Sequence, residues 1–238
     1  MERLDKVLSN LGYGSRKEIK AIVKQGIVKI DGNIIKDSAI QIDPEKVNIE
    51  INGEEVFYRK YIYLMMNKPQ GVISATYDNY DTTVVDLIGP EYAVFNPFPV
   101  GRLDKDTVGL LLLTNDGELN HRLISPKWHV YKVYYAEIDS PVNARDIEVF
   151  EEGVVLDDGY KCMSAHLNIL ESNESGSKIE LTIQEGKFHQ VKRMFNSVGK
   201  TVTFLKRIKF GPLDLDAELE EGEIRELSKD EIDMLKEI

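Results

Sequence analysis

The sequence predicts an α+β protein in which a small αβ module precedes a larger domain built on a mostly antiparallel mixed sheet. In the first 40 residues, two helical patterns and a hairpin pattern follow one another. In the remainder, strand-like runs outnumber helix-like runs and lack the regular alternation of a parallel βαβ sheet. We place the boundary near residue 58, so the expected domains cover residues 1–58 and 59–238.

Two short helices are expected at the start of the chain. Apolar residues follow helical spacing over residues 4–11, and glycines end this segment. Ser15 and Glu18 form a capping box that begins a second helix, and Gly26 is a typical helix stop. Cations recur at every fourth residue of this helix over residues 16–24 and share one face. By spacing alone, this face is equally consistent with a solvated surface and with an RNA contact.

A hairpin and a series of strands and helices are expected to follow. The dipeptide Asp31-Gly32 is a strong two-residue turn between two β-type runs. Periodicity predicts later strands at 61–66, 100–101, 109–113, 130–138 and 179–183, and helices at 118–124, 143–152 and 189–198.

Charge is distributed unevenly along the chain. The formal net charge is −11, but residues 186–213 contain seven Lys or Arg and no Asp or Glu. Residues 1–40 have a net charge of +3, whereas residues 214–238 contain eleven acidic residues and three basic ones. Local basic surfaces decide where phosphates bind, so an acidic protein with two basic zones remains a candidate for nucleic-acid binding.

Several functional classes lack their sequence signatures. No apolar stretch approaches the length of a membrane span, and the charged N-terminus lacks the apolar segment of a secretory signal, so we expect a cytoplasmic protein without membrane contact. The single Cys162 excludes an intramolecular disulfide, and the four histidines show no paired spacing for a metal. A P-loop, a dinucleotide fingerprint and a nucleophile elbow are also missing. We therefore expect no metal and no cofactor.

Residues 101–107, GRLDKDT, form a polar segment between two apolar runs. Asp104 and Asp106 are typical turn formers, and the local pattern alone favours that interpretation. An ionised carboxylate close to Arg102 and Lys105 could also act as a nucleophile. The segment is therefore a turn, a reactive site or both.

Residues 3–32, RLDKVLSNLGYGSRKEIKAIVKQGIVKIDG, closely resemble the S4 RNA-binding domain. In that family, a helix pair and the following hairpin present a basic surface to structured RNA. The resemblance implies phosphate contacts by Arg3, Lys6, Arg16, Lys17 and Lys20.

Three later motifs resemble the RsuA/RluB/E/F-type ribosomal RNA pseudouridine synthases. They are GRLDKDTVGLLLLTNDGEL at 101–119, the Lys-x-Tyr strand motif at 132–134 and EGKFHQVKRM at 185–194, and an N-K-P-x-G element lies at 67–71. Their order and approximate spacing also agree with that family. Together with the S4-like module, the resemblance covers essentially the whole chain.

This resemblance implies that the protein flips a uridine out of ribosomal RNA and isomerises it to pseudouridine without a cofactor. Asp104 matches the catalytic nucleophile, Tyr134 the aromatic residue that stacks on the uracil, Lys192 the basic partner of the aspartate, and Arg102 the arginine that helps displace the flipped base. Further RNA contacts are expected at Lys187, His189, Gln190 and Arg193. Attack on C1′, attack on C6 and a route through a glycal all remain open.

The stretches HRLISPKWH and EGKFHQVKRMF are similar to the RsuA branch, which acts on 16S rRNA. We therefore expect a monomer that acts on 16S rRNA or a small-subunit assembly intermediate; the sequence does not identify the uridine. One alternative is a synthase acting on 23S rRNA, and another is a non-catalytic S4-type RNA-binding protein. A glycosidase would need a second, separated carboxylate, a role that Asp106 is too close to Asp104 in sequence to be assigned.

Overall fold

Residues 1–238 are all described by the computed structural model, and their contacts separate them into two units. The first unit comprises residues 1–62 with 89–96, and the second comprises residues 63–88 with 97–238. The expected domain boundary near residue 58 stays a prediction.

The first unit contains α1 (Leu4–Asn10) and α2 (Arg16–Gln25), and the short α3 (Pro90–Ala93) belongs to its inserted segment. The capping box of Ser15 and Glu18 is formed, and Gly26 ends α2 with a φ of 80°. A four-stranded sheet has the order β3-β2-β5-β6, with bounds β2 (Val28–Ile30), β3 (Asn33–Ile34), β5 (Ile49–Ile51) and β6 (Glu54–Val56). β1 (Glu2–Arg3) pairs with β4 (Gln41–Ile42). The core of this unit contains the apolar residues of both helices and of the sheet, including Leu8, Ile19 and Ile49.

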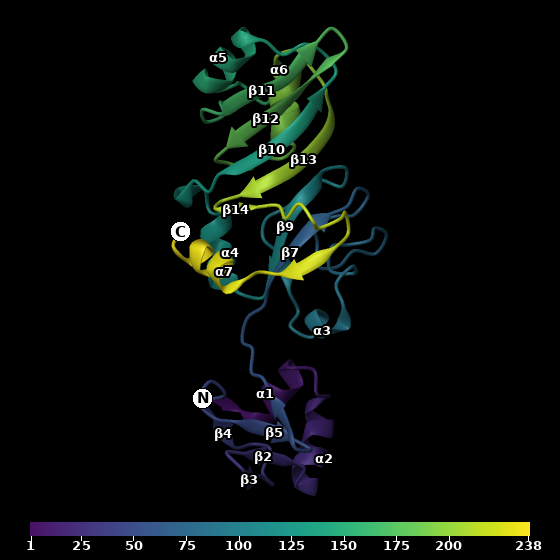
Figure 1. Ribbon diagram of the computed structural model, residues 1–238, viewed down its shortest axis with the longest axis vertical. Coiled ribbons are helices and arrows are strands. Elements are labelled where there is room, and N and C mark those ends of the chain that lie inside the picture. Colours follow the sequence, from purple (N-terminus) through teal and green to yellow (C-terminus); the bar gives the residue numbers. More distant parts are fainter. The chain divides into compact units, whose positions relative to one another are not determined.

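The second unit is built on one nine-stranded sheet with the order β11-β12-β10-β13-β9-β7-β15 (Figure 1). β14 pairs with β13 at its side, and β8 pairs with β9. Only β13 and β9 are parallel neighbours, so the expected mostly antiparallel mixed sheet is confirmed. The bounds are β7 (Tyr63–Lys68), β8 (Phe98–Pro99), β9 (Val108–Thr114), β10 (Lys132–Ile138), β11 (His166–Asn173), β12 (Gly176–Ile183), β13 (Val202–Phe210), β14 (Leu213–Asp214) and β15 (Ile224–Glu226).

Helices flank the two ends of this sheet. In Figure 1, α5 (Ala144–Glu152) and α6 (Gln190–Ser197) lie with β10 to β13, where α5 contacts β11 and α6 contacts β13. α4 (Gly117–Ile124) contacts α7 (Lys229–Lys236) near the other end and is followed by the 3₁₀ turn η1 (Pro126–Trp128). None of these helices has both the length and the apolar character needed to cross a membrane.

A close approach of β9 and β13 aligns three residues across the middle of the sheet. Tyr134 of β10 is paired with Arg207 of β13, which is paired with Gly109 of β9. Gly109 has a φ of +101°, and a Cβ added there would lie 2.3 Å from the carbonyl oxygen of Arg207. Only glycine permits this approach. Because the segment 101–107 leads directly into β9, the pairing brings that segment beside β13 and β10.

Candidate active site

Asp104 lies in the loop between β8 and β9, which is held by specific hydrogen bonds. The amide of Thr107 donates to the carbonyl of Asp104 over 3.1 Å and closes a turn. The hydroxyl of Ser74 accepts from the amide of Leu103 over 3.0 Å and donates to its carbonyl over 2.9 Å. The residue before Asp104 is thereby fixed, while 28% of the Asp104 side chain stays exposed. The segment is both a turn and a fixed support for an accessible carboxylate.

Lys68, the last residue of β7, supports this loop from inside the protein. Its side chain is completely buried, and its ammonium donates to the carbonyls of Thr107 over 2.9 Å and Pro69 over 3.0 Å. Burial lowers the pKa of Lys68 to about 8, although the charges of Asp106 and Asp104 oppose the shift. The N-K-P-x-G element contains this lysine, but the sequence did not identify it as a member of the site.

Lys192 of α6 connects the two aspartates of the loop. Its ammonium lies 3.4 Å from a carboxylate oxygen of Asp104 and 2.5 Å from one of Asp106. Burial alone would raise the pKa of Asp106, but the hydrogen bond and charge of Lys192 bring it below its usual value. The sequence predicts Asp106 as a turn former only, and in the structure it is also an ion-pair partner of Lys192. His189, which precedes α6, places its Nε2 3.6 Å from the other Asp104 oxygen.

A cavity of about 70 Å³ brings the predicted catalytic residues together. Arg102 and Asp104 line it from the loop, and Tyr134 lines it from β10. Tyr135 lies on the opposite face of β10, where its hydroxyl donates to Glu137 over 3.1 Å and its ring meets Phe204 edge to face. Only one tyrosine of the pair is therefore available to the cavity.

The other residues predicted near the site fall into two groups. Lys187, His189 and Gln190 line the 70 Å³ cavity. Gln190 is also buried and holds the preceding turn, because its amide oxygen accepts from the Lys187 backbone over 2.8 Å. Arg193 points elsewhere and is bound by Asp157 and by Asp158. RNA contacts by these four residues stay predictions.

The predicted RNA contacts in the first unit also differ in their surroundings. Arg3 and Arg16 both donate to Asp5, at 2.7 and 2.8 Å, and Lys6 pairs with Glu2 over 2.9 Å. The hydrogen bond from Arg3, followed by that from Arg16, keeps the pKa of Asp5 well below its usual value. The remaining two, Lys17 and Lys20, are exposed on α2 and form no ion pair within the chain. They are therefore the most available cations of the five.

The structure contains neither a cluster of metal-binding side chains nor a reactive thiol. No cluster of three or more His, Cys, Asp or Glu side chains could hold a metal ion. Cys162 is buried, and this burial raises the pKa of its thiol to about 11. A thiol with so high a pKa is a poor nucleophile at neutral pH.

Two family models match the chain. The model of RNA pseudouridylate synthases matches residues 62–197, and the model of the S4 domain matches residues 2–48. A crystal structure of a pseudouridylate synthase superposes with a TM-score of 0.69 at 36% sequence identity and covers 99% of this chain and 100% of its own.

Relatives match over nearly their full length as well. An uncharacterised RNA pseudouridine synthase of Bacillus subtilis, YtzG, is 53% identical over 99% of this chain and 98% of its own. The small-subunit pseudouridine synthase A of Vibrio parahaemolyticus is 38% identical over 97% of this chain and 98% of its own. The large-subunit pseudouridine synthase B of Bacillus subtilis is 36% identical over 99% and 96%. The chain therefore belongs to the RNA pseudouridine synthases that carry an S4 domain, the family that includes the RsuA and RluB enzymes.

Proposed function

We propose that this protein isomerises a uridine of ribosomal RNA to pseudouridine and that Asp104 is the residue that attacks the target nucleotide. One observation carries the proposal: the Asp104 carboxylate is accessible in a cavity lined by Tyr134 and lies 3.4 Å from the Lys192 ammonium. The reaction breaks the C1′–N1 bond and joins C5 of the same ring to C1′. It needs an anion at the sugar or base, together with a surface that holds the detached uracil.

The surroundings of Asp104 support the roles of the other three residues. Lys192 places a positive charge 3.4 Å from the Asp104 carboxylate, where it suits an anionic nucleophile. The ring of Tyr134 suits stacking on the flipped uracil, as aromatic side chains do with unstacked RNA bases. Arg102 lines the same cavity, and its long cationic side chain suits the space that the flipped base leaves in the RNA. All four residues come from one chain, so a monomer suffices.

We infer that the substrate is 16S rRNA or a small-subunit assembly intermediate in the cytoplasm. The relatives named for the small and large subunits have nearly equal identities, 38% and 36%, so identity does not separate the two. The motif EGKFHQVKRM supports the small subunit because it has Phe188-His189 where large-subunit enzymes usually have Asn-Arg. Phe188 is 71% exposed and stacks on His189, with 3.7 Å between ring centroids, beside the Asp104 cavity.

Tritium release tests the reaction and the substrate together. RNA transcribed with C5-tritiated uridine loses its label when pseudouridine forms. The purified protein is expected to release tritium from 16S transcripts or partly assembled small subunits, and to release less from 23S RNA. A stronger release from 23S RNA would contradict the 16S assignment, and no release from either RNA would contradict the proposed reaction.

Replacing Asp104 by Asn tests the role of the carboxylate. Asp104→Asn keeps the shape of the side chain but removes the anion, so tritium release should fall by about a thousandfold or more. RNA affinity, measured by filter binding, should stay within about threefold, since the RNA contacts remain. Asp214→Asn, which alters an exposed partner of Lys209, is the matched control and should be fully active. Asp104→Asn with normal turnover would assign the chemistry to another residue.

A further inference from the structure

A second cavity, of about 250 Å³, adjoins the Asp104 cavity. The two share Arg102, Tyr134, Gly186 and Lys187 as lining residues. The charged residues of the larger cavity are the cations Arg102, Lys132, Lys187 and Arg207 and a single carboxylate, Glu185. We call it the cationic cavity. Its excess of positive charge stands out in a protein with a net charge of −11.

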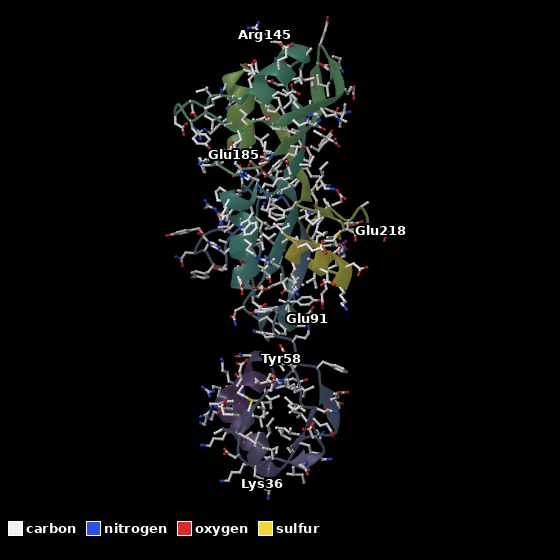
Figure 2. All side chains as sticks on the ribbon, turned by 90° about the vertical axis from the view of Figure 1, so that its left-hand side faces the viewer. Lys36, Tyr58, Glu91, Arg145, Glu185 and Glu218 are labelled. Carbon is white, nitrogen blue, oxygen red and sulfur yellow. The ribbon has the colours of Figure 1, made fainter.

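Glu185 supplies one negative charge against these four cations and forms no ion pair with any of them, because its oxygens accept hydrogen bonds from other groups. It is 7% exposed and accepts hydrogen bonds from the hydroxyl of Tyr160 over 2.7 Å, the amide of Met163 over 2.9 Å and the side chain of Gln190 over 2.7 Å. Figure 2 shows Glu185 in the middle of the second unit, between Arg145 and Glu218. These hydrogen bonds hold Glu185 in the wall of the cavity.

Arg207 is a buried cation with an unsatisfied donor. It is 2% exposed, and its Nε donates to the carbonyl of Leu110 over 2.8 Å, but its Nη2 has no hydrogen-bond partner. The guanidinium lies 5.0 Å from the ring centroid of Phe210. A buried charge with an unsatisfied donor is costly unless an acceptor or a counter-charge reaches it.

Lys132 adds a second cation on the neighbouring strand. Its ammonium lies 5.7 Å from the same Phe210 ring and donates only to the carbonyl of Val130, over 2.8 Å. No carboxylate forms an ion pair with Lys132 or Arg207. Burial lowers the pKa of Lys132 to about 8, and the charge of Arg207 adds to this shift while Glu185 opposes it. The two cations thus lie in one cavity without an ion-pair partner, and the single carboxylate Glu185 leaves an excess of positive charge.

We propose that the cationic cavity binds a backbone phosphate of the RNA next to the flipped uridine, with Lys132 and Arg207 as its counter-charges. This inference rests on the proposed function, which places the uridine in the adjoining Asp104 cavity. A phosphodiester supplies one negative charge and oxygen acceptors, which are what these two cations lack. Phosphate binding here would hold the sugar in place while its base is detached and turned.

The only tryptophan, Trp128, provides a probe beside the cavity. It ends η1, whose first residue Pro126 lines the cavity together with the following His129. The full-length protein should be titrated with uridine 5′-monophosphate, uridine and inorganic phosphate while Trp128 fluorescence is followed. We expect the monophosphate to bind about tenfold more tightly than uridine, and inorganic phosphate to displace it. Equal binding of the monophosphate and uridine would overturn the proposal.

Substitutions at Lys132 locate the effect. Lys132→Gln should remove most of the preference for the monophosphate over uridine, whereas Lys132→Arg, which keeps a cation, should retain it. Lys178→Gln is the matched control, since it removes one positive charge from the neighbouring β12 outside the cavity, and it should bind both ligands like the unmodified protein. Circular dichroism checks that each variant is folded. A folded Lys132→Gln protein with an unchanged preference would overturn the proposal.

The two proposals fail in different ways because this assay needs no turnover. A preference for the monophosphate that depends on Lys132, in a protein that releases no tritium, would support the phosphate site and contradict the proposed reaction. Tritium release by a protein that binds uridine and its monophosphate equally would support the reaction and contradict the phosphate site. If Lys132→Gln does not fold, the two ligands are compared in the unmodified protein and in Lys132→Arg. Equal binding of the monophosphate and uridine in both proteins would overturn the proposal.

Discussion

Lys68 stabilises the Asp104 loop with an ammonium group that is fully removed from solvent. It donates to the carbonyls of Thr107 and Pro69, and its positive charge acts on Asp104 and Asp106. Replacing it by Met would remove the cost of burying a charge but would leave two buried carbonyls without a donor. Because the buried ammonium can lose its proton, the effect of this substitution on stability depends on pH.

The sign of this dependence follows from the pKa of Lys68. The unfolded lysine loses its proton near pH 10.4, the folded one near pH 8. Between these values the unfolded state binds more protons, so raising the pH stabilises the folded protein relative to a variant without the lysine. Below pH 8 the cost of the buried charge is fully present.

We therefore predict that, as the pH rises from 7.5 to 10.5, the free energy of unfolding of the unmodified protein increases by about 3 kcal/mol relative to that of Lys68→Met. Urea unfolding at several pH values measures it. Lys178→Met, at an exposed lysine paired with Glu171, is the control and should show no such increase. Parallel pH profiles for the unmodified protein and Lys68→Met would show that Lys68 is not a buried ammonium.

Sequence motifs identified the candidate residues in and beside the Asp104 cavity, but not the buried cations Lys68 and Arg207. Asp104, Tyr134 and Lys192 lie in motifs whose spacing could be compared with a known family. Lys68 follows the predicted strand at 61–66 and carries no local signal of burial, and Arg207 is one of seven cations in residues 186–213. Their burial depends on the pairing of β7, β9 and β13, strands that lie far apart in the sequence. Local patterns contain no information about that pairing.

At the scale of elements, Asp5 joins the two helices of the first unit. It lies on α1, is 5% exposed, and accepts hydrogen bonds from Arg3, directly before α1, and from Arg16, the first residue of α2. The pKa of Asp5 is held below its usual value, so its stabilising effect is present above about pH 4 and is lost as the pH falls further. The contact fixes the helix pair and also orients two of the predicted RNA contacts.

Asp5→Ala should destabilise the first unit by about 2 kcal/mol at pH 7, because it removes the buried carboxylate whose hydrogen bonds join the half-exposed Arg3 and Arg16. Thermal unfolding followed by circular dichroism measures the change, and the loss should shrink toward pH 3, where Asp5 is increasingly protonated in the unfolded chain. Asp43→Ala is the control: Asp43 forms an exposed pair with Lys46, and its loss should cost less than about 1 kcal/mol. Equal effects of the two substitutions would show that Asp5 is not a structural link.

Elements with clear local signals were predicted well, whereas β13 and β11, which lack such signals, were not. The capping box of α2, the stop at Gly26 and strand β10 were all expected near their observed positions. β13 was missed because cations interrupt its apolar pattern, and its identity as a strand comes from pairing with β10 and β9. β11 was missed because it pairs only with β12 and is largely exposed at the sheet edge. The capping box of Ser228 and Glu231 could have predicted α7.

At the scale of the whole molecule, positive charge is concentrated in a few places within an acidic protein. Lys17 and Lys20 are exposed cations of the first unit, and the cationic cavity belongs to the second. If the S4 domain binds the RNA and the second unit performs the reaction, changes in the two units should affect different kinetic constants. Lys17 and Lys20 are the best positions for this test, because Arg3 and Arg16 also support Asp5.

The double variant Lys17→Ala/Lys20→Ala should raise KM for RNA by about tenfold and leave kcat within about twofold. Two lost phosphate contacts should also reduce the slope of log affinity against log salt by about 1.5. Lys46→Ala, at a lysine of the same unit that is paired with Asp43, should change neither quantity. Asp104→Asn should give the opposite result, with a large loss of kcat and nearly normal binding. A fall in kcat at unchanged KM in the double variant would place Lys17 and Lys20 in the chemistry, and an unchanged salt slope would show that RNA approaches by another surface.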